Sequence, residues 1–158
     1  MSSTYDSPTV PPSDSMTVPP AYRPTVLLTG GNRSFIMVAM DLMLETVLEE
    51  VIARLEPLSL CRVILFGSHA QGRATPDSDL DLLIVLDRDD LPRTHQQRVQ
   101  LDLSVLRALR DLRQRYAMDI IVHTQAMYQR FLAGNSAFAR EIQQTGVTVY
   151  EAGHARMA

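Results

Sequence analysis

The sequence predicts a mixed α/β fold, in which short apolar strands alternate with amphipathic helices in a single domain. Three apolar runs of strand length, one long stretch with apolar residues at helical spacing, and further amphipathic segments lead to this prediction. The chain has 158 residues, of which 46% are hydrophobic and 21% are charged. That length suits one domain with a true core and is short for two.

The first 36 residues differ in composition from the rest of the chain. Serine, threonine and proline dominate there, and the tetrapeptide Thr-Val-Pro-Pro occurs twice. Such a segment buries too little apolar surface to offset the entropy of ordering it, so we expect residues 1–36 to be a disordered extension. The folded domain should then span residues 37–152. Within the extension, Val26–Leu28 has the apolar character of a short strand, and the glycine pair after it lacks the lysine of a phosphate-binding P-loop.

The first half of the domain predicts one helix and two strands. Apolar residues recur every three or four positions from about Met40 to Glu56, and Pro57 should end that helix. The apolar run Arg62–Phe66 predicts a short buried strand. Leu80–Leu86 predicts a second strand of the same kind.

The second half predicts three more helices and two more strands. A long amphipathic helix should run from about Pro92 to Arg115, followed by a strand at Ala117–His123. Ala126–Leu132 and Ser136–Gln144 have the pattern of short helices, the second with a serine N-cap. Val147–Tyr150 is expected to add a last strand.

The charged residues and cysteines narrow the class of protein. The net charge is −3, which favours neither broad nucleic-acid binding nor attachment to a membrane surface. All fifteen basic residues are arginine, so a lysine Schiff base is impossible, and arginine, serine or backbone N–H groups must hold any phosphate. Cys61 is the single cysteine, so an internal disulfide cannot form. With no signal sequence or membrane-length apolar run, we expect a cytoplasmic protein.

The end of the first predicted strand has the features of a phosphate-binding turn. The strand runs into Gly67, where the missing Cβ lets the backbone approach a ligand closely. Ser68 follows with a hydroxyl donor, and Ser68–Gln71 could open a short helix. Free N–H groups at the start of a helix suit a phosphate.

Three aspartates predict a metal site near that turn. Asp79 and Asp81 lie two residues apart at the start of a strand, so both carboxylates should share one face and repel each other unless a cation lies between them. Mg²⁺ is the natural cation, because it prefers oxygen ligands. Asp119 is a lone aspartate in an apolar strand, which is costly unless it is paired or binds metal. If the two strands are neighbours, the three carboxylates outline a two-metal phosphoryl-transfer site.

This motif resembles the signature of the DNA polymerase β-type nucleotidyltransferase superfamily. Gly67-Ser68, ten further residues and then Asp-x-Asp form that signature, and the run Ser-Asp-Leu-Asp-Leu is similar to the minimal nucleotidyltransferases, or MNT proteins. The resemblance implies an α+β (α/β-like) fold with a small mixed sheet flanked by helices. It also implies that Gly67 and Ser68 hold the β- and γ-phosphates. Asp79 and Asp81 would bind metal, and Asp119 would complete the site and help to activate the acceptor hydroxyl.

The resemblance further implies a donor, a cofactor and a partner. Two Mg²⁺ ions would assist the transfer of AMP from ATP to a hydroxyl group. Many MNT proteins are antitoxins paired with HEPN-domain toxins, so a HEPN-type toxin with an acceptor tyrosine is the implied partner. One residue departs from the pattern, because the family often has arginine where this chain has Gln71. Arg73, two residues later, could supply that charge at the nucleotide. Because the predicted core fills most of the chain, we expect the acceptor to bring its own surface.

Two other functions fit the same residues. A small-molecule nucleotidyltransferase, acting on an aminoglycoside-like compound, would use the same carboxylates. A non-catalytic antitoxin would neutralise its partner by binding alone, and Gln71 is the residue that favours this reading. His69 is interpreted as an exposed loop side chain rather than a catalytic group, and Cys61 as a small core residue.

Overall fold

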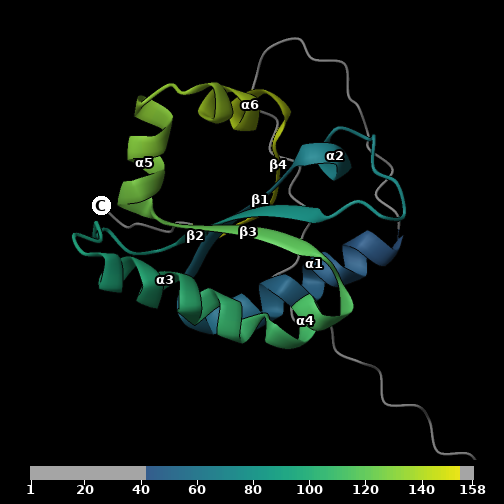
Figure 1. Ribbon diagram of the computed structural model, residues 1–158, viewed down its shortest axis with the longest axis horizontal. Helices are drawn as coiled ribbons and strands as arrows, with labels where there is room; N and C mark the ends of the chain where they lie inside the picture. Colours follow the sequence, from purple (N-terminus) through teal and green to yellow (C-terminus); the bar gives the residue numbers. More distant parts are fainter. Residues whose placement is uncertain (1–41, 154–158) are drawn as a thin grey trace, which may run out of the picture.

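The computed structural model describes residues 42–153 (Figure 1). The elements are α1 (Leu42–Leu55), the 3₁₀ helix η1 (Glu56–Leu58), β1 (Leu60–Phe66), α2 (Gly67–Ala70), β2 (Leu80–Leu86), α3 (His95–Ala108), α4 (Arg110–Arg115), β3 (Met118–Thr124), α5 (Gln125–Ala133), α6 (Ala137–Thr145) and β4 (Val147–Glu151). The predicted extension at residues 1–36 and the predicted strand at Val26–Leu28 lie outside the described residues. No helix within 42–153 is long and apolar enough to cross a membrane.

The four strands form one mixed sheet in the order β3-β2-β1-β4. β1 pairs antiparallel with both β2 and β4, while β2 and β3 run parallel. Parallel neighbours require a long crossover connection, and α3 and α4 provide it. The expectation of a small mixed sheet flanked by helices is therefore confirmed.

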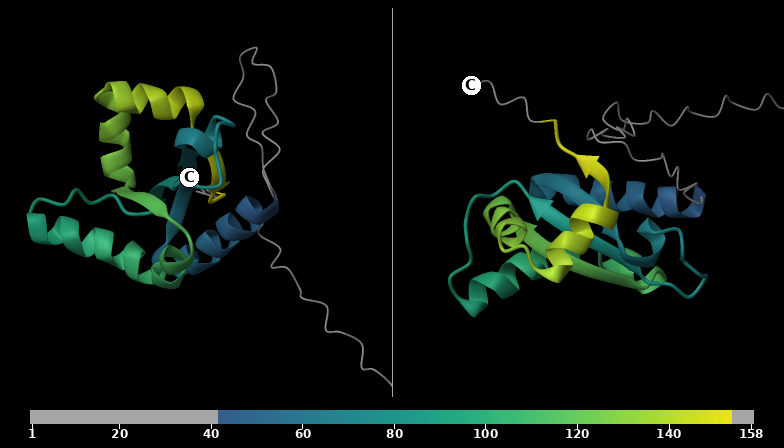
Figure 2. Two further views of the ribbon diagram at one scale, coloured as in Figure 1. Left: turned by 45° about the vertical axis from the view of Figure 1, so that its right-hand side comes forward. Right: turned by 90° about the horizontal axis from the view of Figure 1, so that it is seen from above.

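Helices cover both faces of the sheet, so the fold has three layers. Alternation along β2 places Leu82 and Ile84 in a core with α1, α3 and α4, whereas Leu83 and Val85 belong to a second core with α5 and α6. Figures 1 and 2 show α1, α3 and α4 on one side of the sheet and α5 and α6 on the other. Because both faces are covered, the central strands β1 and β2 are apolar along nearly their whole length.

Aromatic rings fill much of the second core. Phe66 contacts Phe138 edge-on with ring centroids 5.5 Å apart, and Phe138 contacts Phe131 at the same separation. Phe131 in turn meets the ring of His123 at 5.3 Å. These contacts hold α5 and α6 against the sheet, from the end of β1 to the end of β3.

The four strands predicted within the described residues are all present, but the predicted helix at 92–115 is wrong in its start and its continuity. The helix begins at His95, because the Thr94 side chain accepts a hydrogen bond from the Gln97 N–H and completes a capping box there. Leu109 then interrupts it with φ −98° and ψ 9°. This one-residue interruption separates α3 from α4, and both Leu109 and Leu112 are fully buried.

A buried hydroxyl at Thr124 joins β3 and α5 to the loop after β2. The Thr124 hydroxyl donates to the Asp90 carbonyl at 2.6 Å and accepts from the Met127 N–H at 3.2 Å.

Thr124→Val keeps the shape of the side chain but leaves two polar backbone groups unpaired, so we expect the free energy of unfolding to fall by about 2 kcal/mol. Urea denaturation measures this change. Thr145→Val removes only a hydroxyl bonded to an exposed helical carbonyl, so an equal loss in this control would contradict the explanation.

Candidate active site

The end of β1 and the beginnings of β2 and β3 meet at one end of the sheet. Phe66, the last residue of β1, is in register with Asp81, the second residue of β2. Asp81 is in turn in register with Asp119, the second residue of β3. The turn that begins at Gly67 therefore lies next to two carboxylates from neighbouring strands. In Figure 1 this end lies on the right, beside α2 and the junction of α4 with β3.

Asp81 and Asp119 point to the same face of the sheet. Leu80 and Leu82, which flank Asp81, pack into the core with α1, α3 and α4, so alternation directs Asp81 to the side of α5 and α6. Asp119 is exposed, so the expected cost of a lone aspartate in an apolar strand does not arise here. It escapes burial because it lies near the start of β3, the edge strand of the sheet.

Asp79 lies in the loop just before β2 rather than in the strand, and its side chain is exposed. A turn holds this loop: the Ser78 N–H donates to the Thr75 carbonyl at 3.0 Å, and the Ser78 hydroxyl accepts from the Thr75 N–H at 2.8 Å. One residue later, the Leu80 N–H donates to the Ala117 carbonyl at 2.9 Å. These bonds fix the approach to β2 beside the start of β3.

Gly67 is the point of closest approach between the turn and the carboxylates. Its φ is +70°, a conformation that costs little only for glycine. A Cβ at this position would overlap the Asp81 carboxylate, reaching its Cγ at 2.9 Å. Glycine is therefore required here both by the backbone conformation and by the space that Asp81 occupies.

Ser68 lies in the first turn of α2 and is half-buried. Phe66 at the N-cap position provides no side-chain hydrogen bond to this turn. The leading N–H groups of a helix lack acceptors within the helix, so they can donate to an anion. This arrangement suits a phosphate oxygen next to the Ser68 hydroxyl.

Gln71 and Arg73 lie side by side just beyond α2. The Arg73 guanidinium donates to the side-chain oxygen of Gln71, and Arg73 is exposed. The arginine thus brings a positive charge to the position at which Gln71 departs from the family pattern. Its role in nucleotide binding stays a prediction.

The electrostatics of the site centre on Asp81. Burial raises the pKa of the Asp81 carboxyl, and the negative charges of Asp119 and Asp79 raise it further, while His69 acts in the opposite direction. His69 is half-buried on α2, with Nε2 3.4 Å from the Ser78 carbonyl, so the expectation of an exposed loop side chain is wrong.

Glu141 on α6 is a further carboxylate that raises the pKa of Asp81. The sequence did not indicate a role for this residue, because Glu141 has the pattern of an ordinary solvent-facing glutamate on an amphipathic helix. Only the packing of α6 through Phe138 against Phe66 brings it to this end of the sheet.

The donor set fits a hard divalent cation. Carboxylate oxygens are the ligands that Mg²⁺ prefers, and a cation would relieve the repulsion that raises the pKa of Asp81. Within residues 42–153, no three acidic, cysteine or histidine side chains already form a ready ligand set. Asp79, Asp81 and Asp119 could hold a cation after side-chain rotation, with phosphate oxygens completing its coordination.

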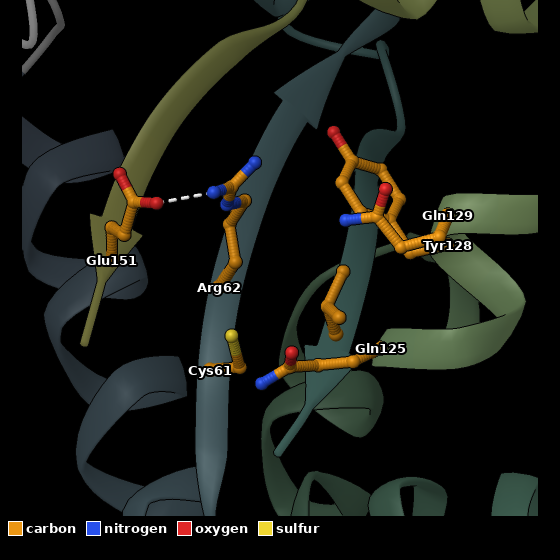
Figure 3. Close-up of a pocket in the computed structure, with 7 residues that line it drawn as sticks. Cys61, Arg62, Gln125, Tyr128, Gln129 and Glu151 are labelled. Atoms are coloured by element: carbon orange, nitrogen blue, oxygen red, sulfur yellow. Dashed lines mark hydrogen bonds and ion pairs between the residues drawn. The ribbon is translucent and has the colours of Figure 1, made fainter. Parts of the chain in front are cut away.

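The polar hollow shown in Figure 3 lies toward the other end of β1 and belongs to the packing of β4. It has a volume of about 150 Å³ and is lined by Cys61, Arg62 and Tyr128 among others. Arg62 forms an ion pair with Glu151 of β4, and its guanidinium lies 5.5 Å from the centre of the Tyr128 ring. Cys61 is buried, as expected from the sequence, and burial raises the pKa of its thiol. This hollow includes none of the predicted site residues.

A comparison with protein-family models decides the class of this protein. The model of the nucleotidyltransferase domain matches residues 44–147, which cover most of the described chain and the whole site above. The chain belongs to the nucleotidyltransferase domain family. The matched range includes the parallel β2–β3 pair, the Gly67 turn and the three aspartates, whose roles stay predictions. None of the curated proteins compared with the chain matches it.

Three solved structures are similar to this nucleotidyltransferase. A toxin-antitoxin with AMP-PNP has 18% identity and a TM-score of 0.41, over 66% of this chain and 73% of that one. A mutant of the toxin-antitoxin MntA-HpeT has 17% identity and a TM-score of 0.40 over the same shares. A candidate nucleotidyltransferase from Sulfolobus solfataricus has 22% identity and a TM-score of 0.43, over 78% of this chain and 92% of that one. Likeness at this level does not extend to what these proteins bind.

Proposed function

We propose that this nucleotidyltransferase moves AMP from ATP to a hydroxyl group on a partner protein. The observation that carries the proposal is the register pairing of Asp81 with Asp119 beside the Gly67 turn. In this proposal the turn and the Ser68 hydroxyl hold the β- and γ-phosphates. Asp79, Asp81 and Asp119 bind Mg²⁺.

The transfer forms a bond between the acceptor oxygen and the α-phosphorus, and breaks the bond from that phosphorus to the bridging oxygen. Pyrophosphate leaves, and the proton of the acceptor hydroxyl passes to Asp119 and then to solvent. When bound, two Mg²⁺ ions lower the pKa of the acceptor hydroxyl and neutralise negative charge on the departing pyrophosphate. Asp119 suits the acceptor side, because it is exposed on an edge strand and can be approached from outside.

A macromolecular acceptor is favoured by the exposure of the site. Asp79 and Asp119 are both exposed, and Asp119 lies on the edge strand of the sheet. An acceptor that carries its own surface needs no pocket in this protein. Together with the resemblance to MNT proteins, this exposure supports a HEPN-type toxin, modified on a tyrosine hydroxyl, as the partner.

The test uses purified protein, Mg²⁺, the product of the neighbouring gene, and ATP labelled at the α- or the γ-phosphate. We expect label in the partner from α-labelled ATP only, and none with Asp79→Asn, because the metal site loses a ligand. Asp77→Asn removes a nearby exposed carboxylate and should leave transfer unchanged.

Other outcomes favour other functions. Transfer from the γ-label would overturn nucleotidyl transfer. Labelling of an aminoglycoside without any protein partner would favour the small-molecule enzyme. A tight complex that is never labelled would favour an antitoxin that acts by binding alone.

A further inference from the structure

A second hollow lies at the opposite end of the sheet from the aspartates. It has a volume of about 600 Å³ and lies between the loop before α3, the first turns of α3, the end of β3, and α5. In Figure 1 the start of α3 and α5 lie on the left, whereas α2 lies on the right. Sites for small ligands have volumes of roughly 300–1,000 Å³, so this groove is large enough for one.

Three arginines give the groove a positive charge. Arg93, Arg98 and Arg130 all line it. Arg98 is partly neutralised, because its Nε donates to Asp102 at 3.1 Å. Arg93 and Arg130 form no ion pair within residues 42–153, and the nearby Asp90 is already paired with Arg88 at 2.8 Å. Two uncompensated guanidinium groups therefore face the groove, and guanidinium groups match phosphate oxygens in shape and charge.

One wall of the groove is largely apolar, with the Phe131 and His123 rings meeting edge to face. Phe131 and His123 line it with ring centroids 5.3 Å apart, and Met127 adds a polarisable sulfur atom. Burial and the charge of Arg98 lower the pKa of His123 to about 4, so its ring is neutral at pH 7. Its Nδ1 is buried without a hydrogen-bond partner among the described residues. Such a wall offers a planar base an aromatic surface, and the neutral His123 ring adds no charge that would repel the arginine side of the groove.

We infer that this groove binds a nucleoside phosphate, with phosphate oxygens on Arg93 and Arg130 and the base against Phe131. The site is separate from the one at Asp79, Asp81 and Asp119 and goes beyond the function proposed above. Because guanidinium groups carry the charge, binding here requires no metal ion. A free nucleotide and the phosphorylated end of an RNA share this chemistry.

Calorimetry in EDTA isolates this site, because binding at the aspartates depends on metal. We expect ATP to bind the full-length protein with one site, and equally well after Asp81→Asn with Asp119→Asn. Arg93→Ala with Arg130→Ala should weaken binding at least about tenfold, since each lost guanidinium–phosphate contact is charge-assisted. Arg107→Ala with Arg113→Ala removes the same charge from exposed positions outside the groove and should change nothing.

Binding of two further ligands shows which part of a nucleotide the groove recognises. Pyrophosphate should bind more weakly than ATP, because it has no base. A 5′-phosphorylated tetraadenylate that binds more tightly than ATP would identify an RNA end as the source, and weaker binding would identify the free nucleotide.

Each remaining outcome overturns the inference. No binding of ATP in EDTA, equal binding of pyrophosphate and ATP, or equal weakening by both arginine pairs would do so. Arg93→Lys with Arg130→Lys, which keeps the charge, should recover part of the affinity, and its thermal unfolding excludes a folding defect. If ATP binds the groove as expected but no AMP is transferred to a partner protein, only the function proposed above is contradicted.

Discussion

Gly67→Ala should abolish nucleotidyl transfer while the chain still folds. The new methyl group would overlap the Asp81 carboxylate, and alanine would have to adopt a φ of +70°. Either the turn or Asp81 must move, and the geometry of the phosphate site and of the metal ligand is lost together. We expect activity to fall more than about 100-fold, because small displacements of reacting groups have effects of that size.

Gly72→Ala is the matched control for this substitution. Gly72 also has a positive φ, of +67°, but a Cβ there would meet nothing within 4 Å. Both variants should lose about 1 kcal/mol of stability from backbone strain, and Gly67→Ala about 1–3 kcal/mol more from the overlap. Urea denaturation and the transfer assay separate the two effects. If Gly72→Ala loses as much activity as Gly67→Ala, strain in the turn and not contact with Asp81 is the cause.

Asp81→Asn should lower activity and raise stability at the same time. Loss of a metal-binding carboxylate is expected to reduce transfer at least about 100-fold, which corresponds to about 2.7 kcal/mol of transition-state stabilisation. Without metal, the wild-type carboxylate is partly buried and repelled by Asp119 and Asp79. The asparagine has the same shape and no charge, so in EDTA at pH 7 the variant should unfold at a higher temperature than the wild type.

The raised pKa of Asp81 also predicts how the stability difference between the wild type and Asp81→Asn changes with pH. The pKa of Asp81 is raised in the folded chain from its ordinary value of 3.8, so the folded state binds more protons than the unfolded state just above that value. The free energy of unfolding contributed by this group therefore falls as pH rises from 3.8 through the raised pKa, and stays low above it. The stability advantage of Asp81→Asn should grow across that window. Addition of Mg²⁺ should stabilise the wild type more than the variant. A variant that is less stable than the wild type in EDTA at pH 7 would contradict this account.

The strands and the positions of the turn and of the aspartates could be predicted from local signals. An apolar run such as Leu80–Leu86 is buried on both faces, so its pattern alone indicates a strand. Gly67, Ser68, Asp79 and Asp81 lie within one short stretch of chain, where spacing is informative.

The remaining features depend on how distant segments pack. The exposure of Asp119 follows from the place of β3 at the edge of the sheet, which its own sequence does not encode. Glu141 reaches the site only through the packing of α6. The interruption at Leu109 could not be predicted from the pattern, because Val105, Leu109 and Leu112 keep regular helical spacing and are all buried.

The pairing of Asp81 with Asp119 determines which changes in sequence leave the spacing of the two carboxylates unaltered. Hydrogen bonds between adjacent strands hold the backbones of these two residues opposite each other, at the spacing of about 4.8 Å common to all β-sheets. The separation of the carboxylates is thus inherited from the backbone rather than from any loop or neighbouring side chain. Mutations elsewhere, or insertions in the crossover between β2 and β3, can accumulate without altering it. A one-residue slip between the two strands, in contrast, would send Asp119 to the opposite face.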